Sequence, residues 1–360
     1  MTVRKAMPFL WRYLLVVLSS CMLAFIISSQ AHGATDPSSK MNYEKVGQFA
    51  FTTQDQQWRD DARGRALPVR IHAPSSLALS GDAAKPNALF PVILFSHGLG
   101  GAKEAGKYWG EHWASHGYIV VHIQHPGSDE SIWKGKRGEA AVSGMKSAMT
   151  MSNLGLRVGD VQFALDEIMA KQHAKSAIFE FADTNKIGMS GHSFGAQTTF
   201  LLSGQKSPSV GGQTGFDKRI TSAIAFSPNA RNKNNLDKQF GDIRMPFMSI
   251  TGSLDGSILE DKTEPFHRTL PHKHMPAGNK YLIVFDQGDH GVFGGQASGR
   301  WRKELPRDDE IRMLTKAASL AFWEATLKSN VQAKNWLNSR SQTQAGFAKM
   351  LAVNDVFEIK

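Results

Sequence analysis

Residues 186–202 of this 360-residue chain read KIGMSGHSFGAQTTFLL, and this stretch decides the fold. Lys186 to Met189 is a short apolar run typical of a buried strand, and Phe194 to Leu202 has the composition of a buried helix. Between them, Gly191-His192-Ser193-Phe194-Gly195 sets a serine between two glycines. This spacing allows a sharp turn from strand to helix that exposes the serine hydroxyl above the end of the strand. Ser193 is therefore a candidate nucleophile.

Apolar and β-branched runs alternate with segments of helical spacing on both sides of this stretch. The predicted strands lie at residues 67–72, 91–96, 118–123, 186–189, 220–226, 246–251 and 281–285. The predicted helices lie at residues 105–116, 194–202 and 308–327, within 330–350, and on a face formed by Leu154, Val158, Val161, Leu165 and Ile168. Such alternation predicts an α/β architecture with a doubly wound, mostly parallel sheet. Three long stretches, 126–150, 204–219 and 256–279, are expected to form a rim or partial cap.

A second glycine-rich turn follows another apolar strand, at Ser96-His97-Gly98-Leu99-Gly100-Gly101. In a fold of this kind, the first crossover brings such a loop close to the nucleophile. The backbone N–H groups of Leu99 and Phe194 are then candidate donors to the negative charge that develops on an attacked carbonyl oxygen. We expect the side chain of His97 to brace the loop rather than to take part in the chemistry.

A base and an acid follow Ser193 in the chain order that this fold uses. Gly288-Asp289-His290-Gly291 comes just after a predicted strand, so His290 is the candidate base. Asp255 lies at the turn after the preceding strand and is the candidate acid, although a turn aspartate can also cap its own loop. The other acids nearby are Glu260, Asp261, Glu264 and Asp289. His192 is expected to point away from the serine, into the core.

The first 31 residues have the composition of an export signal. A basic beginning is followed by an apolar run over residues 13–27 and by Ser29-Gln30-Ala31, with small residues at the two positions that signal peptidase reads. The predicted organisation is a signal peptide at 1–31, a linker at 32–44 and one catalytic domain at 45–360, exported to the periplasm or the medium. Two alternatives stay open, a retained N-terminal anchor and a lipid on Cys21, where Leu18-Ser19-Ser20-Cys21 resembles a lipoprotein box.

The amino-acid composition excludes some kinds of chemical site and bears on the binding partners of the protein. Cys21 is the only cysteine, so the mature chain would have no disulfide, thiolate metal site or cysteine nucleophile. The 42 basic and 32 acidic residues give a net charge of +10. This charge is compatible with peripheral contact to an anionic membrane or cell wall, but a solvated basic surface is the favoured interpretation. No basic run with interleaved aromatic residues indicates nucleic acid.

Other polar residues are expected to be structural. His267, His272 and His274 fall in a proline-containing stretch and are interpreted as a solvated loop rather than as metal ligands. Arg157 and Asp160 lie on a predicted helix and are interpreted as a structural face or an ion pair.

Together, Phe95-Ser96-His97-Gly98-Leu99-Gly100 and Gly191-His192-Ser193-Phe194-Gly195 resemble the plasma-type platelet-activating-factor acetylhydrolases and their bacterial, dienelactone-hydrolase-like relatives in the α/β-hydrolase superfamily. Ala114-Ser115-His116-Gly117-Tyr118-Ile119-Val120 continues the resemblance, which thins toward His290. It implies an α/β-hydrolase fold with Ser193 as nucleophile, His290 as base and the amides of Leu99 and Phe194 as oxyanion donors. It also implies no metal or organic cofactor, and ester substrates with short or oxidised acyl groups, including acetylated phospholipids.

The chain departs from this family at one position. The animal enzymes take their acid from just after the strand that follows the nucleophile helix, where this chain reads Ala225-Phe226-Ser227-Pro228-Asn229, without a carboxylate. The sequence therefore predicts a serine hydrolase of small-molecule or lipid esters that takes its acid from Asp255. An amidase or a polyester hydrolase would use the same triad, and a catalytically silent binding module on the same fold is the alternative from another class.

Overall fold

The computed structural model describes residues 42–75, 89–207, 215–230, 232–257, 263–295, 302–340 and 345–360. Residues from Asn42 to Lys360 form one compact unit. The predicted signal peptide, Cys21 and most of the predicted linker lie outside the described residues. No helix in the described ranges is long and apolar enough to cross a membrane.

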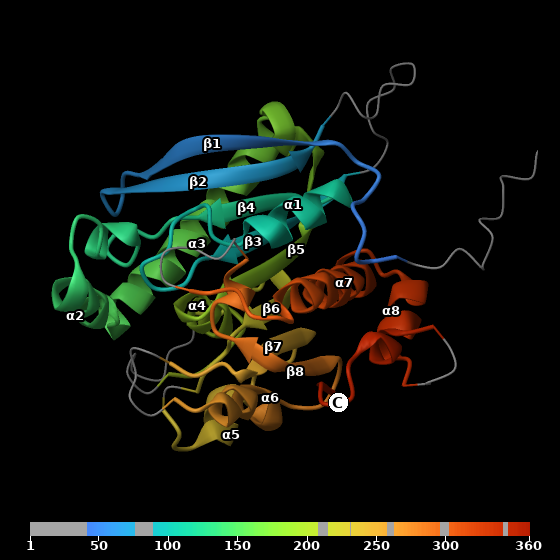
Figure 1. Cartoon of the computed structure of the whole chain (residues 1–360). Coiled ribbons are helices and arrows are strands. Elements are labelled where there is room, and N and C mark those ends of the chain that lie inside the picture. The colour runs from blue at the N-terminus through green and yellow to red at the C-terminus, as the bar shows by residue number, and fades with distance from the viewer. Residues whose placement is uncertain are drawn as a thin grey trace, which may run out of the picture. The chain divides into compact units, whose positions relative to one another are not determined.

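A nine-stranded sheet forms the centre of this unit (Figure 1). Its strands in chain order are β1 (Phe51–Asp60), β2 (Arg65–Pro74), β3 (Phe90–Ser96), β4 (Ile119–Ile123), β5 (Ala182–His192), β6 (Ile220–Phe226), β7 (Phe247–Leu254), β8 (Lys280–Asp289) and β9 (Val356–Ile359). They lie in the order β1-β2-β4-β3-β5-β6-β7-β8-β9. The predicted doubly wound, mostly parallel sheet is confirmed.

Strands β3 to β8 pair in parallel, whereas β1, β2 and β9 add antiparallel edges. The central segments of the parallel strands are buried, and all seven residues of β3 are, as expected for a sheet covered on both faces. The carboxyl ends of β5, β7 and β8 therefore come to one edge of the sheet. A crevice at that edge is where ligands bind in open α/β sheets.

Helices cover the two faces of the sheet (Figure 1). The α-helices are α1 (Lys107–Ser115), α2 (Gly138–Ala148), α3 (Met151–His173), α4 (Phe194–Leu202), α5 (Leu236–Phe240), α6 (Leu270–His274), α7 (Asp308–Leu327) and α8 (Val331–Asn338). Short 3₁₀ segments are η2 (Glu130–Ile132), η3 (Ala177–Phe181), η5 (Pro265–Thr269), η6 (Val292–Gly294) and η7 (Phe347–Met350). Helices α3 and α4 pack together against one face, while α1 and α7 contact each other on the opposite face.

The apolar stripe predicted for α3 is confirmed. All five of its residues are buried, from Leu154 to Ile168, and they pack in one cluster with the sheet and with α4. Phe200 of α4 belongs to the same cluster and stacks on Phe247 of β7. Burying side chains of this size contributes about 1.5–3 kcal/mol each relative to exposure, which holds α4 against the sheet at the nucleophile turn.

Several elements were not predicted. The polar strand β1 has most of its side chains exposed, and β9 follows the segment 330–350. Within that segment, where the sequence indicated a helix, the described residues form α8 and η7. His290 follows β8, which is the penultimate strand in the chain because β9 comes after it. Helix α2 occupies much of the stretch 126–150.

One part of the predicted rim is wrong. The described residues of the stretch 204–219 follow the end of α4 and precede β6, so they lie at the amino ends of the strands, away from Ser193. The Asp217 N–H bonds the Leu202 carbonyl there. A stretch that follows a helix must return to the start of a strand, whereas stretches 126–150 and 256–279 leave from the carboxyl ends of β4 and β7.

Candidate active site

The serine turn sits between β5 and α4, as the sequence predicts. Ser193 has φ 55° and ψ −111°, an unfavourable conformation for a residue with a side chain, and such strain costs about 1–3 kcal/mol. Two glycines make the turn possible. A Cβ at Gly195 would lie 1.9 Å from the Ser96 carbonyl oxygen, and a Cβ at Gly191 would lie 2.4 Å from the Gly195 carbonyl oxygen. The turn is thus pressed against the end of β3.

Ser193, His290 and Asp255 come together at the carboxyl edge of the sheet. The Ser193 Oγ lies 3.0 Å from His290 Nε2, and His290 Nδ1 lies 2.7 Å from Asp255 Oδ1. The Asp255 side chain is fully buried, whereas that of His290 is 35% exposed, so the imidazole is accessible from the crevice. With Nδ1–H donated to the carboxylate, the unprotonated Nε2 can accept the serine proton.

Asp255 is held in place by two further contacts. Its Oδ2 accepts a hydrogen bond from the Thr251 hydroxyl at 2.7 Å, and its Oδ1 lies 2.7 Å from Nε of Arg268, which is also buried. Burial alone would raise the pKa of Asp255, but His290 and Arg268 outweigh it and hold the pKa below its usual value. Asp255 is therefore ionised at neutral pH.

Arg268 also binds the end of β6, where the sequence has no carboxylate. Its Nη1 donates to the Ser227 carbonyl at 2.9 Å and to the Pro228 carbonyl at 3.3 Å, at the end of β6. Its Nε donates to the Asp255 carbonyl at 2.6 Å, beyond the end of β7. One buried guanidinium thus links the two strand ends from which a triad acid can come.

The turn that carries His290 has its own cap. The Asp289 Oδ1 accepts the N–H groups of Gly291 at 3.1 Å and Val292 at 3.0 Å, and both its carboxylate oxygens lie 2.8 Å from Nε of Arg302. Arg302 is bound in turn by Asp308, at the start of α7. The Asp289 side chain therefore diverges from the imidazole, as expected, and anchors the histidine turn to α7.

The glycine-rich loop after β3 lies beside the nucleophile. A Cβ at Gly98 would be 3.5 Å from the Ser193 Cβ, so the backbone of Gly98 and Leu99 passes next to the serine. The Gly100 carbonyl accepts a hydrogen bond from the Trp133 indole at 2.6 Å, which ties the loop to the stretch 126–150. Phe194 is the first residue of α4, where an N–H has no acceptor within the helix. Both candidate oxyanion donors are thus next to Ser193.

His97 braces this loop, as the sequence predicts. Its ring Nε2 accepts the backbone N–H of His125 at 3.0 Å, which makes Nδ1 the protonated nitrogen and the donor to the Gly98 carbonyl at 2.6 Å. Burial, and then the charge of Arg157, lower the pKa of His97 well below its usual value. His97 is therefore neutral, with one tautomer fixed by its neighbours.

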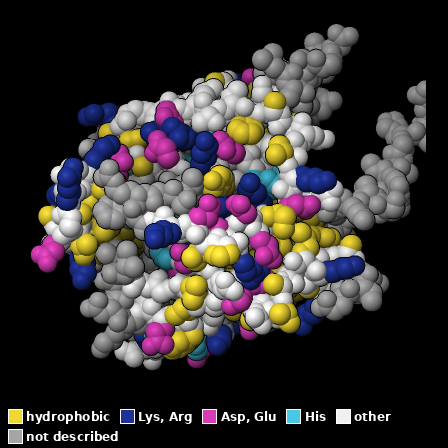
Figure 2. Space-filling model, viewed as in Figure 1, with side chains coloured by type: hydrophobic (Ala, Val, Ile, Leu, Met, Phe, Trp, Pro, Cys, Tyr) yellow, Lys and Arg dark blue, Asp and Glu magenta, His cyan; other side chains and the backbone are white. Residues whose placement is uncertain are grey.

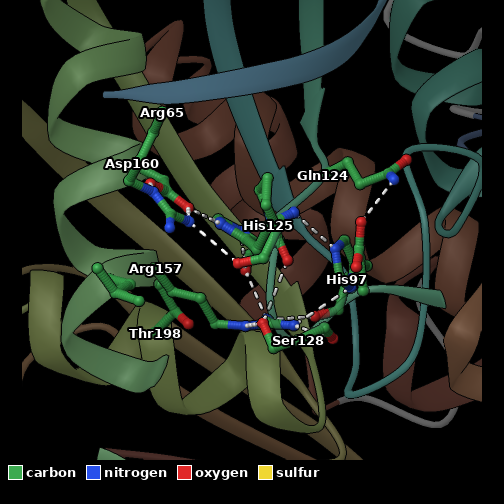
Figure 3. A network of polar contacts seen from close by, with 12 residues as sticks. Arg65, His97, Gln124, His125, Ser128, Arg157, Asp160 and Thr198 are labelled. Carbon is green, nitrogen blue, oxygen red and sulfur yellow. Dashed lines mark hydrogen bonds and ion pairs between the residues drawn. The ribbon is translucent and has the colours of Figure 1, made fainter. Parts of the chain in front are cut away.

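A buried polar network lies behind the loop (Figure 3). The Ser96 Oγ is 2.9 Å from His125 Nε2, and His125 Nδ1 is 3.1 Å from Asp160 Oδ2. This second serine-histidine-aspartate chain is fully buried, so no ester reaches Ser96. Arg65 also binds Asp160, with Nε 2.8 Å from Oδ1. Asp160 thus holds β2, β4 and α3 together.

Arg157 and Asp160 are structural residues, as interpreted from the sequence, and Asp160 forms its ion pairs with Arg63 and Arg65. Both are fully buried, and each is bound to other partners. The sequence did carry a signal, because position 157 falls on the apolar face of α3 with Leu154 and Val161. A charge on an apolar face predicts a buried and fully bonded group.

Two expectations about histidines are wrong. His192 does not enter the core, because its Nε2–H donates to the His290 carbonyl at 2.9 Å and its ring lies 4.7 Å from that of His290. His267 and His272 are buried in η5 and α6 rather than solvated, while His274 binds Asp237. The described residues contain no group of three or more potential ligands that could hold a metal ion.

Comparisons with known proteins agree with this geometry. The family model described as platelet-activating factor acetylhydrolase, isoform II, matches residues 72–154, which include the loop after β3 but not the triad. The chain is 29% identical over 138 residues to the platelet-activating factor acetylhydrolase of Bos taurus, covering 30% of this chain and 31% of the relative. The fold is that of an α/β-hydrolase.

Two cutinases share this α/β-hydrolase fold over longer stretches. Cutinase est1 of Thermobifida alba is 23% identical over 218 residues, covering 59% of this chain and 60% of the relative. Cutinase 2 of Thermobifida cellulosilytica is 23% identical over 188 residues, covering 52% and 56%. The chain matches less than two thirds of the length of each relative. The resemblance to acetylhydrolases, stated from the sequence motifs, is thus confirmed, and the chain is also similar to cutinases.

Proposed function

We propose that the protein is a serine hydrolase of carboxylic esters. The observation that carries the proposal is the continuous hydrogen-bonded chain from Ser193 Oγ through His290 to the buried Asp255 carboxylate. Relatives named acetylhydrolase and cutinase support ester bonds as the target.

The mechanism follows from the direction of each hydrogen bond. As Ser193 attacks the ester carbonyl, its proton passes to His290 Nε2, and Asp255 stabilises the imidazolium through Nδ1–H. The Leu99 and Phe194 N–H groups bind the oxyanion. The imidazolium then protonates the leaving alcohol, which leaves an acyl group on Ser193. Water, deprotonated by the same imidazole, attacks the acyl-enzyme and releases the acid.

We expect short-acyl esters to be the preferred substrates, a finer point that rests on the resemblance to acetylhydrolases. A second candidate, hydrolysis of a polymeric ester, is favoured by the likeness to cutinases and by two exposed apolar side chains near the acid. Leu254 is 54% exposed at the end of β7, and Phe266 is 55% exposed in η5. Release of soluble acid from a polyester film, compared with hydrolysis of p-nitrophenyl butyrate, separates the two.

The test of the proposal is Ser193→Ala. We expect it to abolish hydrolysis of p-nitrophenyl butyrate and labelling by a fluorophosphonate probe. The thermal midpoint should barely fall. Ser193 Oγ makes its hydrogen bond with His290 at the solvent-accessible end of the proposed triad, and the substitution keeps a Cβ in the same backbone conformation. Probe labelling at any other serine in the variant would contradict the assignment, and a wild type that neither labels nor hydrolyses would contradict the function.

The cellular location of the protein and its contact with a membrane or cell wall are predictions from the sequence. Figure 2 shows Lys and Arg side chains interspersed with Asp and Glu on the visible face. Contact with an anionic surface and export through the predicted signal peptide are proposed from the sequence.

A further inference from the structure

Arg157 is a buried cation directly behind the proposed oxyanion loop. It lies on α3, and its side chain is fully buried (Figure 3). Its Nη1 donates to the His97 carbonyl at 2.6 Å, and its Nε to the Ser128 hydroxyl at 2.8 Å. Its Nη2 reaches the Gly98 carbonyl at 3.4 Å. The guanidinium thus donates to the loop that follows β3 and also to Ser128, in the stretch that follows β4.

These contacts act on the peptide unit that carries the first oxyanion donor. The Gly98 carbonyl and the Leu99 N–H belong to one planar peptide group. That carbonyl accepts from His97 Nδ1 at 2.6 Å as well as from Arg157. Donors on the carbonyl fix the peptide plane, and hydrogen bonds in such a chain polarise one another, so the N–H on the other side becomes a stronger donor.

The same guanidinium contacts the residue that carries the second donor. Its central carbon lies 4.7 Å from the centroid of the Phe194 ring, within the range of a cation–π interaction. Phe194 provides the N–H at the start of α4. One side chain therefore contacts both the peptide group that carries the Leu99 N–H and the ring of Phe194, although these donors are almost one hundred positions apart in the chain.

The charge of Arg157 is not cancelled by a direct ion pair among the residues that the structure describes. Asp160, the acid one turn along α3, is already bound by Arg65 and His125. Burial lowers the pKa of Arg157 to about 9, which leaves the guanidinium protonated at neutral pH. This buried positive charge interacts with Asp160 and Asp129 without a direct ion pair, and next to the loop it favours the development of negative charge nearby.

We propose that Arg157 is a positioning residue of the oxyanion hole, which aligns and polarises the Leu99 amide through the Gly98 carbonyl and fixes Phe194 through its ring. This inference rests on the proposed ester hydrolysis. It assigns to Arg157 a selective effect on the transition state, since the ester substrate in its ground state carries no oxyanion.

The decisive variant is Arg157→Met, which keeps much of the side-chain volume and removes the charge and all donors. We expect kcat for p-nitrophenyl butyrate to fall about 10- to 100-fold. This decrease is smaller than or similar to the decrease in kcat when one oxyanion donor is removed from such enzymes. KM should stay within about threefold, because uniform substrate binding is not affected. Rates are normalised to the sites that react with a fluorophosphonate probe, so unfolded protein does not count.

Binding of a transition-state analogue separates this role from a merely structural one. A trifluoromethyl ketone with a butyl chain adds to the serine and places an alkoxide in the oxyanion hole. Its inhibition constant should rise by about the same factor as kcat falls. Arg157→Lys keeps the charge with fewer donors and should lie between the wild type and Arg157→Met, so it serves if the methionine variant does not fold.

Arg65→Met is the matched control. It removes another buried-network arginine that binds Asp160 and the Pro126 carbonyl but has no hydrogen bond to the loop among the described contacts. It should lower the thermal midpoint and leave kcat within about twofold, because it does not act on the donors. The inference would be overturned by an Arg157→Met enzyme with wild-type kcat and inhibitor binding, or by an equal loss in Arg65→Met. A wild type without esterase activity would instead refute the proposed function.

Discussion

Replacing Asp255 with asparagine removes the charge of the proposed acid while keeping its shape. In one amide orientation, the oxygen replaces Oδ1 and still accepts from His290 Nδ1, while the amide nitrogen faces the Thr251 hydroxyl, which can accept. The histidine tautomer can therefore survive. In the other orientation, an N–H group faces Nδ1 and the tautomer is lost as well.

The magnitude comes from the charge that is lost. A carboxylate and an imidazolium with centres about 4 Å apart attract each other by about 4 kcal/mol at an effective dielectric constant of about 20. Each 1.36 kcal/mol is about tenfold in rate, so the loss is about a thousandfold in kcat. Arg268 would then lie beside the forming imidazolium without its carboxylate, which adds to the loss. We expect kcat to fall at least about a hundredfold, with little change in KM.

The assay is steady-state hydrolysis of p-nitrophenyl butyrate, with active sites counted by the fluorophosphonate probe and the thermal midpoint recorded. The midpoint will fall too, since breaking a buried ion pair costs about 3–5 kcal/mol. Asp289→Asn is the control, because its amide oxygen can still cap Gly291 and Val292, and it should stay within about tenfold of wild type. We expect the same of Asp261→Asn, at a position outside the described residues. Near-normal kcat in Asp255→Asn, together with collapse in either control, would refute the reasoning.

Three further outcomes are expected. Across a series of p-nitrophenyl esters, activity should peak from acetyl to butyryl and fall for longer acyl groups, and a maximum at long chains would contradict the proposed substrate class. The free energy of unfolding, from urea titrations, should decrease as pH falls from about 6.5 toward 4, because burial lowers the pKa of folded His72 to about 4 while the unfolded side chain binds a proton near its ordinary value. The contribution of His72 is at most about 1.4 kcal/mol per pH unit, so His72→Gln should flatten the curve, and an unchanged slope would count against it. Mass spectrometry of the exported protein should find His32 at its N-terminus, without lipid, whereas a diacylglyceryl group on Cys21 would overturn the predicted cleavage.

The sequence predicted best where side chains are buried. Strand β6 spans the predicted residues 220–226, and α7 spans the predicted 308–327. Periodicity fails for β1, since FTTQDQQWRD at residues 51–60 forms an edge strand with most of its side chains in solvent. Such a strand has no continuous apolar face for a sequence pattern to report. The short strand β9, also at an edge, was missed for the same reason.

The members of the proposed triad could be selected from the sequence because each follows a strand at a turn and their chain order is that of the predicted fold. The contacts of Arg268 and Arg157 around the proposed site could not be predicted from the sequence. Arg268 binds the end of β6 from about forty residues away, and Arg157 binds the loop after β3 from sixty residues away. Neither distance leaves a periodic signal, since an arginine looks the same in the sequence whether it is solvated or bonded to buried carbonyls. Only the apolar neighbours of Arg157 on α3 hinted at its burial.

The backbone of Gly195 packs so closely against the Ser96 carbonyl that it limits where the serine turn can lie. Backbone touches backbone there, so the serine turn can neither advance toward the loop after β3 nor exchange its glycine for a larger residue without moving a central strand. The two halves of the proposed active site, the serine turn and the loop after β3, are thus packed backbone against backbone. We therefore expect changes in the proposed ester specificity to arise in the stretches 126–150 and 256–279, which do not include that contact.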